Sequence, residues 1–120
     1  MEEEILFNTK LIAELGNNKS TIVILGFFLN GATKDISELE KSLKENDLLG
    51  LNMKAHKLKG SLGMLHANKL VEILEQLEIA SESEQDFERA QNLTNMFIEK
   101  YAVLINQMER EVASIKASLD

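Results

Sequence analysis

Residues 55–78, AHKLKGSLGMLHANKLVEILEQLE, decide the fold and contain the candidate functional site. At about 100° per residue, apolar side chains of this stretch and the turn before it form one stripe of a predicted helix: Leu51, Ala55, Leu58, Leu62 and Leu65. His56 points about 140° away from the centre of that stripe, so we expect its ring to face water. The pattern therefore predicts a helix packed on a core, with a histidine on its outer side.

Glycines lie on the same outer face as His56. Gly60 and Gly63 follow it by about one and two turns, at positions where glycine costs up to about 1 kcal/mol relative to alanine. Asn52 lies on this face one turn before the histidine, and Lys57 follows it directly. Small residues beside an exposed histidine indicate that another protein approaches closely, so we interpret these four residues as candidates for partner binding.

Length and composition predict a single all-α domain spanning residues 1–120. The chain has no proline, no cysteine and 44% apolar residues, which favours helices around one core and excludes disulfides and Cys-based zinc sites. Its acidic N-terminus is unlike a secretory signal, and its longest apolar run, residues 22–29, is far shorter than the roughly 20 residues that span a bilayer. We therefore expect a cytoplasmic protein that binds no membrane.

The charge is acidic overall and locally basic around the histidine. A net charge of −7 disfavours nucleic acid as a partner, because a binder needs a basic face to displace counterions from phosphates. Lys54, Lys57 and Lys59 flank His56 and are interpreted as a positive patch suited to a phosphate or an acidic partner.

Apolar periodicity predicts the remaining elements. In chain order they are a short helix at 10–15, a helical region after residue 18, a polar turn at 45–47, the histidine helix to about 65, a fourth helix, a polar link at 81–85 and a final helix to about 119. The predicted fold is an antiparallel four-helix bundle with a short extra N-terminal helix and a long C-terminal helix. Asn30 and Gly31 are a possible kink or split, Asn46 or Asp47 is the expected cap of the histidine helix, and the phenylalanines and methionines are interpreted as core.

The end of the final helix is expected to project beyond its neighbours. It is either a solvated overhang or a contact for a partner or a second copy through Val112, Ile115 and Leu119. We expect a monomer.

The chemistry that suits an exposed histidine beside lysines is nucleophilic. A neutral imidazole, which is abundant at pH 7, can attack an activated phosphoryl group and hold it as a phosphoramidate. Such a site needs access, orientation and positive charge for the phosphoryl oxygens. Lys59 shares the side of the helix with His56 and is the best candidate for that charge, with Lys57 and Lys54 as weaker ones.

The segment HKLKGSLGMLHANKL, followed by ILEQLE, resembles the signature of the histidine-containing phosphotransfer (HPt) domain family of phosphorelays. The signature reads roughly H-x-L-K-G-S/A-x-x-x-L-G-A-x-x-L, with L-E further on. The matching residues are His56, Leu58, Lys59, Gly60, Ser61, Leu65, Ala67, Leu70, Leu74, Leu77 and Glu78. The resemblance implies a four-helix bundle in which His56 is phosphorylated, Lys59 faces the phosphate and a receiver domain lies close to Gly60.

The resemblance also implies a phosphoryl carrier, rather than an enzyme that hydrolyses nucleotide. Its expected partners are receiver domains of response regulators or hybrid histidine kinases. No cofactor or metal of its own is expected, because Mg²⁺ belongs to the receiver in this scheme. Two alternatives stay open: the phosphoacceptor domain of a chemotaxis-type kinase, and a helical adaptor that is never phosphorylated.

The sequence departs from the family pattern at His66, where the family usually has glycine. The expected role of that glycine is a left-handed cap between two helices, a conformation that is less comfortable for histidine. Ten residues of helix place His66 about 15 Å from His56, which excludes a metal ion shared by the two rings.

Overall fold

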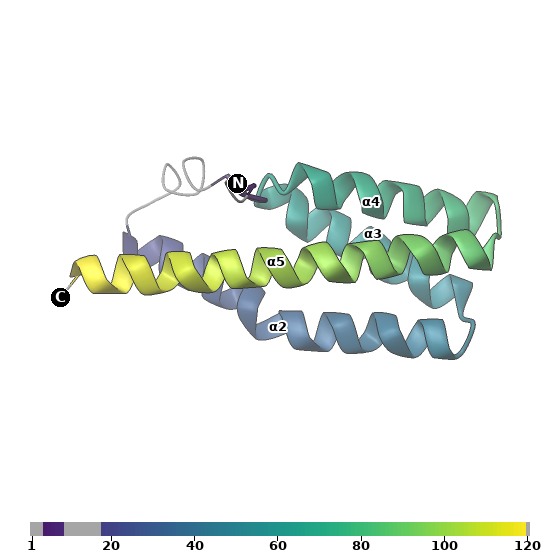
Figure 1. Cartoon of the computed structure of the whole chain (residues 1–120), viewed down its shortest axis with the longest axis horizontal. Helices are drawn as coiled ribbons and strands as arrows, with labels where there is room; N and C mark the ends of the chain where they lie inside the picture. The colour runs from purple at the N-terminus through teal and green to yellow at the C-terminus, as the bar shows by residue number, and fades with distance from the viewer. Residues whose placement is uncertain (1–3, 9–17, 120) are drawn as a thin grey trace.

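The computed structural model describes residues 4–8 and 18–119, and this part of the chain is an antiparallel bundle of four α-helices. The helices are α2 (Asn18–Lys44), α3 (Leu48–Met64), α4 (Asn68–Glu78) and α5 (Phe87–Leu119), and a π-helical turn, η1 (Ile79–Ser83), extends α4. Figure 1 shows that successive helices run in opposite directions. The described residues contain no strand, so the predicted all-α bundle is confirmed, while the helix predicted at 10–15 lies outside them.

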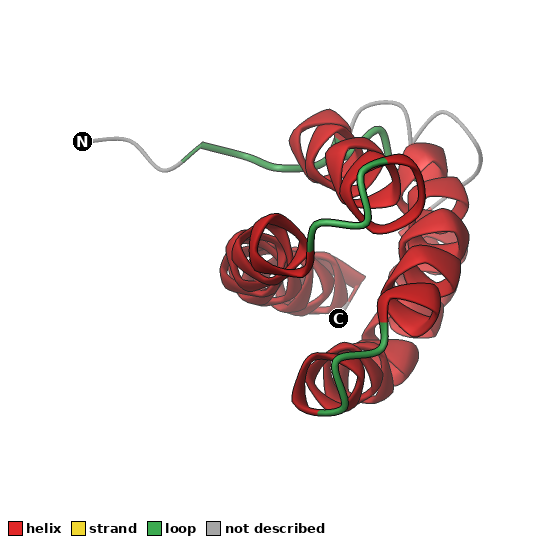
Figure 2. Cartoon of the chain, turned by 90° about the vertical axis from the view of Figure 1, so that its right-hand side faces the viewer, coloured by secondary structure: helices red, strands yellow, loops and turns green. Residues whose placement is uncertain are grey.

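Figure 2 shows the four helices nearly end-on, and buried apolar residues from all four form one core cluster between them. The predicted stripe of α3 is buried at every position, and α4 buries the four residues that its periodicity indicates: Leu70, Ile73, Leu74 and Leu77. From α5, Phe97 and Tyr101 are fully enclosed with ring centroids 5.1 Å apart. This core holds α3 with its opposite side facing solvent.

The turn before α3 is fixed by a side-chain cap. Asp47 occupies the N-cap position, and its Oδ1 accepts a hydrogen bond of 2.8 Å from the backbone N–H of Gly50. Such a cap satisfies one of the amides left without a partner at the start of a helix. Of the expected caps, Asp47 is confirmed, and Asn46 instead takes a positive φ of 54° in the turn.

The turn after α3 has a left-handed residue at the position where the family pattern has glycine. His66 has a φ of 55°, and its N–H donates to Gly63 O while the N–H of Ala67 donates to Leu62 O, both at 3.1 Å. This pair of hydrogen bonds defines a Schellman motif, in which glycine is the usual left-handed residue. The histidine is tolerated there at some cost in backbone energy.

Two features of the predicted elements are corrected. Of the kink or split predicted at Asn30 and Gly31, the split is wrong, because the helix α2 is continuous through both residues. The link predicted at 81–85 begins later, because the helical rod of α4 continues through η1 and buries Ser81. Burial costs this hydroxyl little, since it donates to Leu77 O at 2.7 Å.

Both described ends of the chain are packed against the bundle over part of their length. Residues 4–8 lie against α5, where Gln107 accepts from the N–H of Leu6 at 2.9 Å and donates to Glu4 O at 2.6 Å. Near the end of α5, Ile115 is buried and Leu119 is 47% exposed. The expected projecting end is therefore confined to the last residues of the helix. Within the described residues, no helix is long and apolar enough to cross a membrane.

Candidate functional site

His56 stands on the outer face of α3, in the middle of the helix. Its side chain is 75% exposed, and its Nδ1 lies 3.4 Å from Oε2 of Glu78 on α4. An ionised carboxylate can only accept a hydrogen bond, so in this contact Nδ1 is the donor. A neutral ring bonded in this way keeps its lone pair on Nε2, the nitrogen that remains available for reaction.

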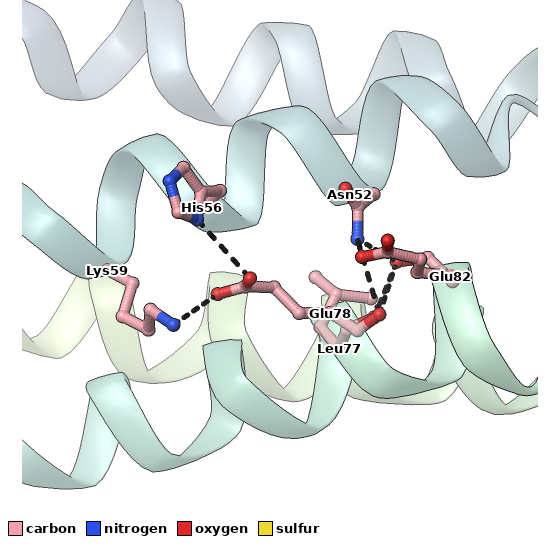
Figure 3. A network of polar contacts seen from close by, with 7 residues as sticks. Asn52, His56, Lys59, Leu77, Glu78 and Glu82 are labelled. Carbon is pink, nitrogen blue, oxygen red and sulfur yellow. Dashed lines mark hydrogen bonds and ion pairs between the residues drawn. The ribbon is translucent and has the colours of Figure 1, made fainter.

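Glu78 joins His56 to Lys59, as Figure 3 shows. Its Oε1 lies 2.8 Å from the Nζ of Lys59, while its Oε2 faces the imidazole. Burial alone raises the pKa of Glu78, but the pairing with Lys59 and the contact with His56 outweigh burial and hold that pKa below 4.5. The same pairing raises the pKa of Lys59 more than burial lowers it. Both groups are therefore charged at neutral pH.

The local charge beside the ring is consequently balanced. The cation of Lys59 already has an anionic partner, but an ammonium has three N–H donors, and a single carboxylate oxygen cannot engage all of them. The side chain of Lys59 is 32% exposed, so its remaining donors are accessible to an incoming anion. The site can thus bind an anionic group while the imidazole stays oriented.

Lys54 does not belong to this site, which corrects the predicted positive patch. It is buried on the opposite side of α3, where its Nζ lies 2.7 Å from Asp35 and 2.6 Å from Glu38, both on α2. Burial lowers the pKa of Lys54, but hydrogen bonds to these carboxylates outweigh burial and raise it. At about 100° per residue, Lys54 lies about 160° from His56, so the helical wheel already separates the two.

The glycines lie where the sequence places them. A Cβ atom added at Gly60 or at Gly63 would meet no heavy atom within 4 Å, so no neighbour within the described bundle requires glycine there. Lys57 is exposed beside them. Three large apolar side chains share this solvent-facing side, with exposures of 63% to 71%: Leu49, Met53 and Met64. The prediction that the phenylalanines and methionines are core is therefore wrong for Met53 and Met64, and elsewhere in the bundle for Phe27 and Met96.

Asn52 is turned toward α4 in Figure 3 and is partly buried. Its Nδ2 donates to the backbone oxygen of Glu78 and to Oγ of Ser81, both at 3.2 Å, and to Oε2 of Glu82 at 3.4 Å. The role of Asn52 in partner binding stays a prediction. Its intramolecular hydrogen bonds connect α3 to α4 and η1.

Glu78 is the site residue that reasoning from the sequence missed. It lies 22 residues from His56, and the two approach each other only because α3 packs against α4. One signal was available, because Glu78 is part of the matched L-E of the family pattern and is a charged residue at the edge of the apolar stripe of α4. Among the described residues, no group of three or more His, Asp or Glu side chains is arranged to hold a metal ion.

Comparison with protein families gives one match. The model of the Hpt domain family matches residues 23–118, which includes all four α-helices apart from the first residues of α2 and the last residue of α5. No curated protein and no solved structure matches the chain.

Proposed function

The chain belongs to the Hpt domain family, a family of histidine phosphotransfer domains in phosphorelays, and on this premise we propose that His56 is its phosphoacceptor. In this proposal His56 takes a phosphoryl group from the aspartyl phosphate of one receiver domain and passes it to the aspartate of another. The observation that carries the proposal is the contact between Nδ1 of His56 and Glu78, because it leaves Nε2 free on the exposed side of the ring.

The transfer is balanced in atoms and charge. A bond forms between Nε2 and phosphorus while the bond between phosphorus and the aspartate oxygen breaks, and the receiver regains its carboxylate. The ring then carries a positive charge that Nδ1–H presents to the carboxylate of Glu78. The same protonated ring is the leaving group when a second receiver attacks, so Glu78 supports transfer in both directions.

Lys59 supplies positive charge for the phosphoryl oxygens in this proposal. Its ammonium is held by Glu78 close to the ring, and its free N–H donors stabilise the charge that spreads over those oxygens during transfer. Lys57 is exposed next to His56 but is not held in this way, so its contribution is to attract an acidic partner.

The solvent-facing side of α3 is the surface on which we expect the receiver to dock. We call this surface the docking face, and it consists of Leu49, Met53, His56, Gly60, Gly63 and Met64. The apolar side chains offer area to bury, and the glycines let a partner backbone approach the ring closely. A non-phosphorylated adaptor would need the apolar side chains but neither the glycines nor the oriented ring.

The proposal is tested by following a phosphoryl group between proteins. Receiver domains of the same organism, phosphorylated with radiolabelled acetyl phosphate and freed from it, are incubated with the chain and then chased with a second receiver. We expect an acid-labile, base-stable label on the chain that disappears during the chase. Labelling from ATP through a kinase domain, with none from receivers, would instead identify the phosphoacceptor domain of a chemotaxis-type kinase. If the chain is labelled under neither condition, the result would support the alternative of a helical adaptor that is never phosphorylated.

A further inference from the structure

Asn52 forms hydrogen bonds with the helical segment that carries Glu78 (Figure 3). All three acceptors around its amide are oxygens: the backbone carbonyl of Glu78, the hydroxyl of Ser81 and the carboxylate of Glu82. The carbonyl and the carboxylate cannot donate, so the nitrogen end of the amide must face them. The side chain therefore has a defined orientation, and it acts as a donor from α3 to α4 and η1.

The hydroxyl of Ser81 extends this connection. Ser81 is buried, and its single proton is directed at Leu77 O, 2.7 Å away. Its oxygen is then free to accept from Asn52 at 3.2 Å. The hydrogen bonds thus run in one direction, from Asn52 through Ser81 to the backbone of α4, where they reach the residue directly before Glu78.

This connection lies where the helical geometry changes. The segment after Glu78 is the π-helical turn η1, and such turns are uncommon and found often at functional sites. A wider turn changes the register of the residues around it, so the position of Glu78 depends on how this turn is held. Asn52 is bonded to both sides of the junction, at Glu78 O and at Ser81.

We propose that Asn52 is a positioning residue for phosphoryl transfer, which acts by holding Glu78 against Nδ1 of His56. This inference rests on the proposed function of His56. Asn52 and His56 are four residues apart on one face of α3 and both contact Glu78, one at its backbone oxygen and the other at its carboxylate. Without Asn52, the carboxylate loses its fixed distance from the ring, and the neutral imidazole loses its preference for a proton on Nδ1.

The first experiment measures the tautomer of the ring and requires no phosphorylation. Long-range ¹H–¹⁵N NMR spectra of the His56 ring are recorded at alkaline pH for the wild type, Asn52→Leu, Glu78→Ala and the double variant. We expect the wild type to carry its proton mainly on Nδ1 and both single variants to shift toward Nε2. A wild-type tautomer in Asn52→Leu would overturn the proposal.

The second experiment asks whether Asn52 acts through Glu78. In the wild-type background, Asn52→Leu is expected to slow phosphoryl acceptance about 3- to 10-fold, less than the roughly 100-fold that a displacement of about 1 Å can cost. In the Glu78→Ala background the same substitution is expected to have no further effect. An equal loss in both backgrounds would show that Asn52 acts independently of Glu78, for instance by touching the receiver, and would overturn the proposal.

Two further variants separate positioning from general loosening of the bundle. Ser81→Ala removes an acceptor of Asn52 and is expected to reproduce its effects, so it replaces Asn52→Leu if that protein folds poorly. Ile73→Val removes a buried methyl group from the same helix and is expected to leave both tautomer and transfer unchanged. If Asn52→Leu shifts the tautomer but the wild type shows no phosphoryl transfer, only the proposed function is contradicted. If the wild type transfers phosphoryl groups but Asn52→Leu leaves the tautomer unchanged, only this inference is contradicted.

Discussion

The Nζ of Lys59 lies 2.8 Å from Oε1 of Glu78, so the cation beside the exposed histidine is held by the neighbouring helix. The other oxygen of the same carboxylate faces Nδ1 of His56 at 3.4 Å. The carboxylate of Glu78, which is only 18% exposed, therefore positions both the imidazole of His56 and the ammonium group of Lys59. In the proposed function both groups act on the phosphoryl group. Each group in this arrangement can be changed separately.

Lys59→Ala is expected to slow phosphoryl acceptance or to shorten the lifetime of phosphohistidine. The loss should correspond to about 1 to 3 kcal/mol, as for a charge-assisted contact. Lys57→Ala removes a neighbouring exposed lysine that has no contact with Glu78 and is the comparison variant, with a smaller effect expected. Rates and lifetimes are measured by quenched-flow transfer from a phosphorylated receiver. Equal values for Lys59→Ala and the wild type would show that another group supplies the charge.

Glu78→Gln is expected to change how stability depends on pH. The pKa of Glu78 is lower in the folded protein than its ordinary value of 4.5, so its ionic contribution is present above about pH 4.5 and is lost as the pH falls through the folded value. The free energy of unfolding of the wild type should exceed that of the variant by about 1 kcal/mol at neutral pH. This difference should become smaller at acidic pH. Urea unfolding between about pH 3 and pH 7 measures it, with the exposed Glu72→Gln as control. A difference that stays constant with pH would contradict the ion pair.

Gly60→Gln is expected to improve stability and impair transfer together. Glycine inside a helix costs roughly 0.5 to 1 kcal/mol relative to residues with better helix propensity, and a side chain at Gly60 meets only open space. On the docking face, however, a long side chain one turn from His56 obstructs the receiver. Gly26→Gln, on α2 and also in open space, should raise thermal stability without slowing transfer. A well-folded Gly60→Gln protein with wild-type kinetics would mean that the receiver does not use this face.

His66→Gly is expected to stabilise the protein by about 1 kcal/mol, because its φ of 55° is strained for a residue with a Cβ atom. His66→Ala also removes the imidazole but keeps the Cβ atom, so it should show no such gain. Comparing the two variants separates the effect of relieving backbone strain from the effect of removing the imidazole. Thermal unfolding of the two variants measures the difference. Equal stability of the glycine and alanine variants would show that the turn is not strained, and transfer should be unaffected in both.

The elements that local periodicity controls could be predicted from the sequence. The stripe on α3 fixed which residues are buried and therefore placed His56, Gly60 and Gly63 in solvent. Cap chemistry limited the N-cap of α3 to Asn46 or Asp47, of which Asp47 is the cap, and the family pattern indicated a left-handed residue at the position of His66. These features depend on neighbours within a few residues in the chain, which is the range over which a sequence pattern carries physical information.

The contacts between helices could not be read in the same way. Glu78 reaches His56 and Lys59, and Asn52 reaches Ser81, only because α3 and α4 pack in one register. No sequence pattern predicts the π-helical turn that shifts this register. Apolar periodicity also does not reveal the buried hydrogen bond of Ser81, so the sequence indicates a polar link there. Lys54 is close to His56 in the sequence, but its angle on the helix directs it to the carboxylates of α2 instead of the histidine site.

The most direct measurement locates the phosphoryl group on the chain. The wild type and His56→Gln are incubated with the same phosphorylated receiver, and the labelled site is mapped by mass spectrometry under alkaline conditions. The account predicts a label on His56 alone and none on His56→Gln, with melting temperatures nearly equal because exposed substitutions change stability by no more than about 0.5 kcal/mol. Undiminished labelling of His56→Gln, or a label on His66, would contradict it.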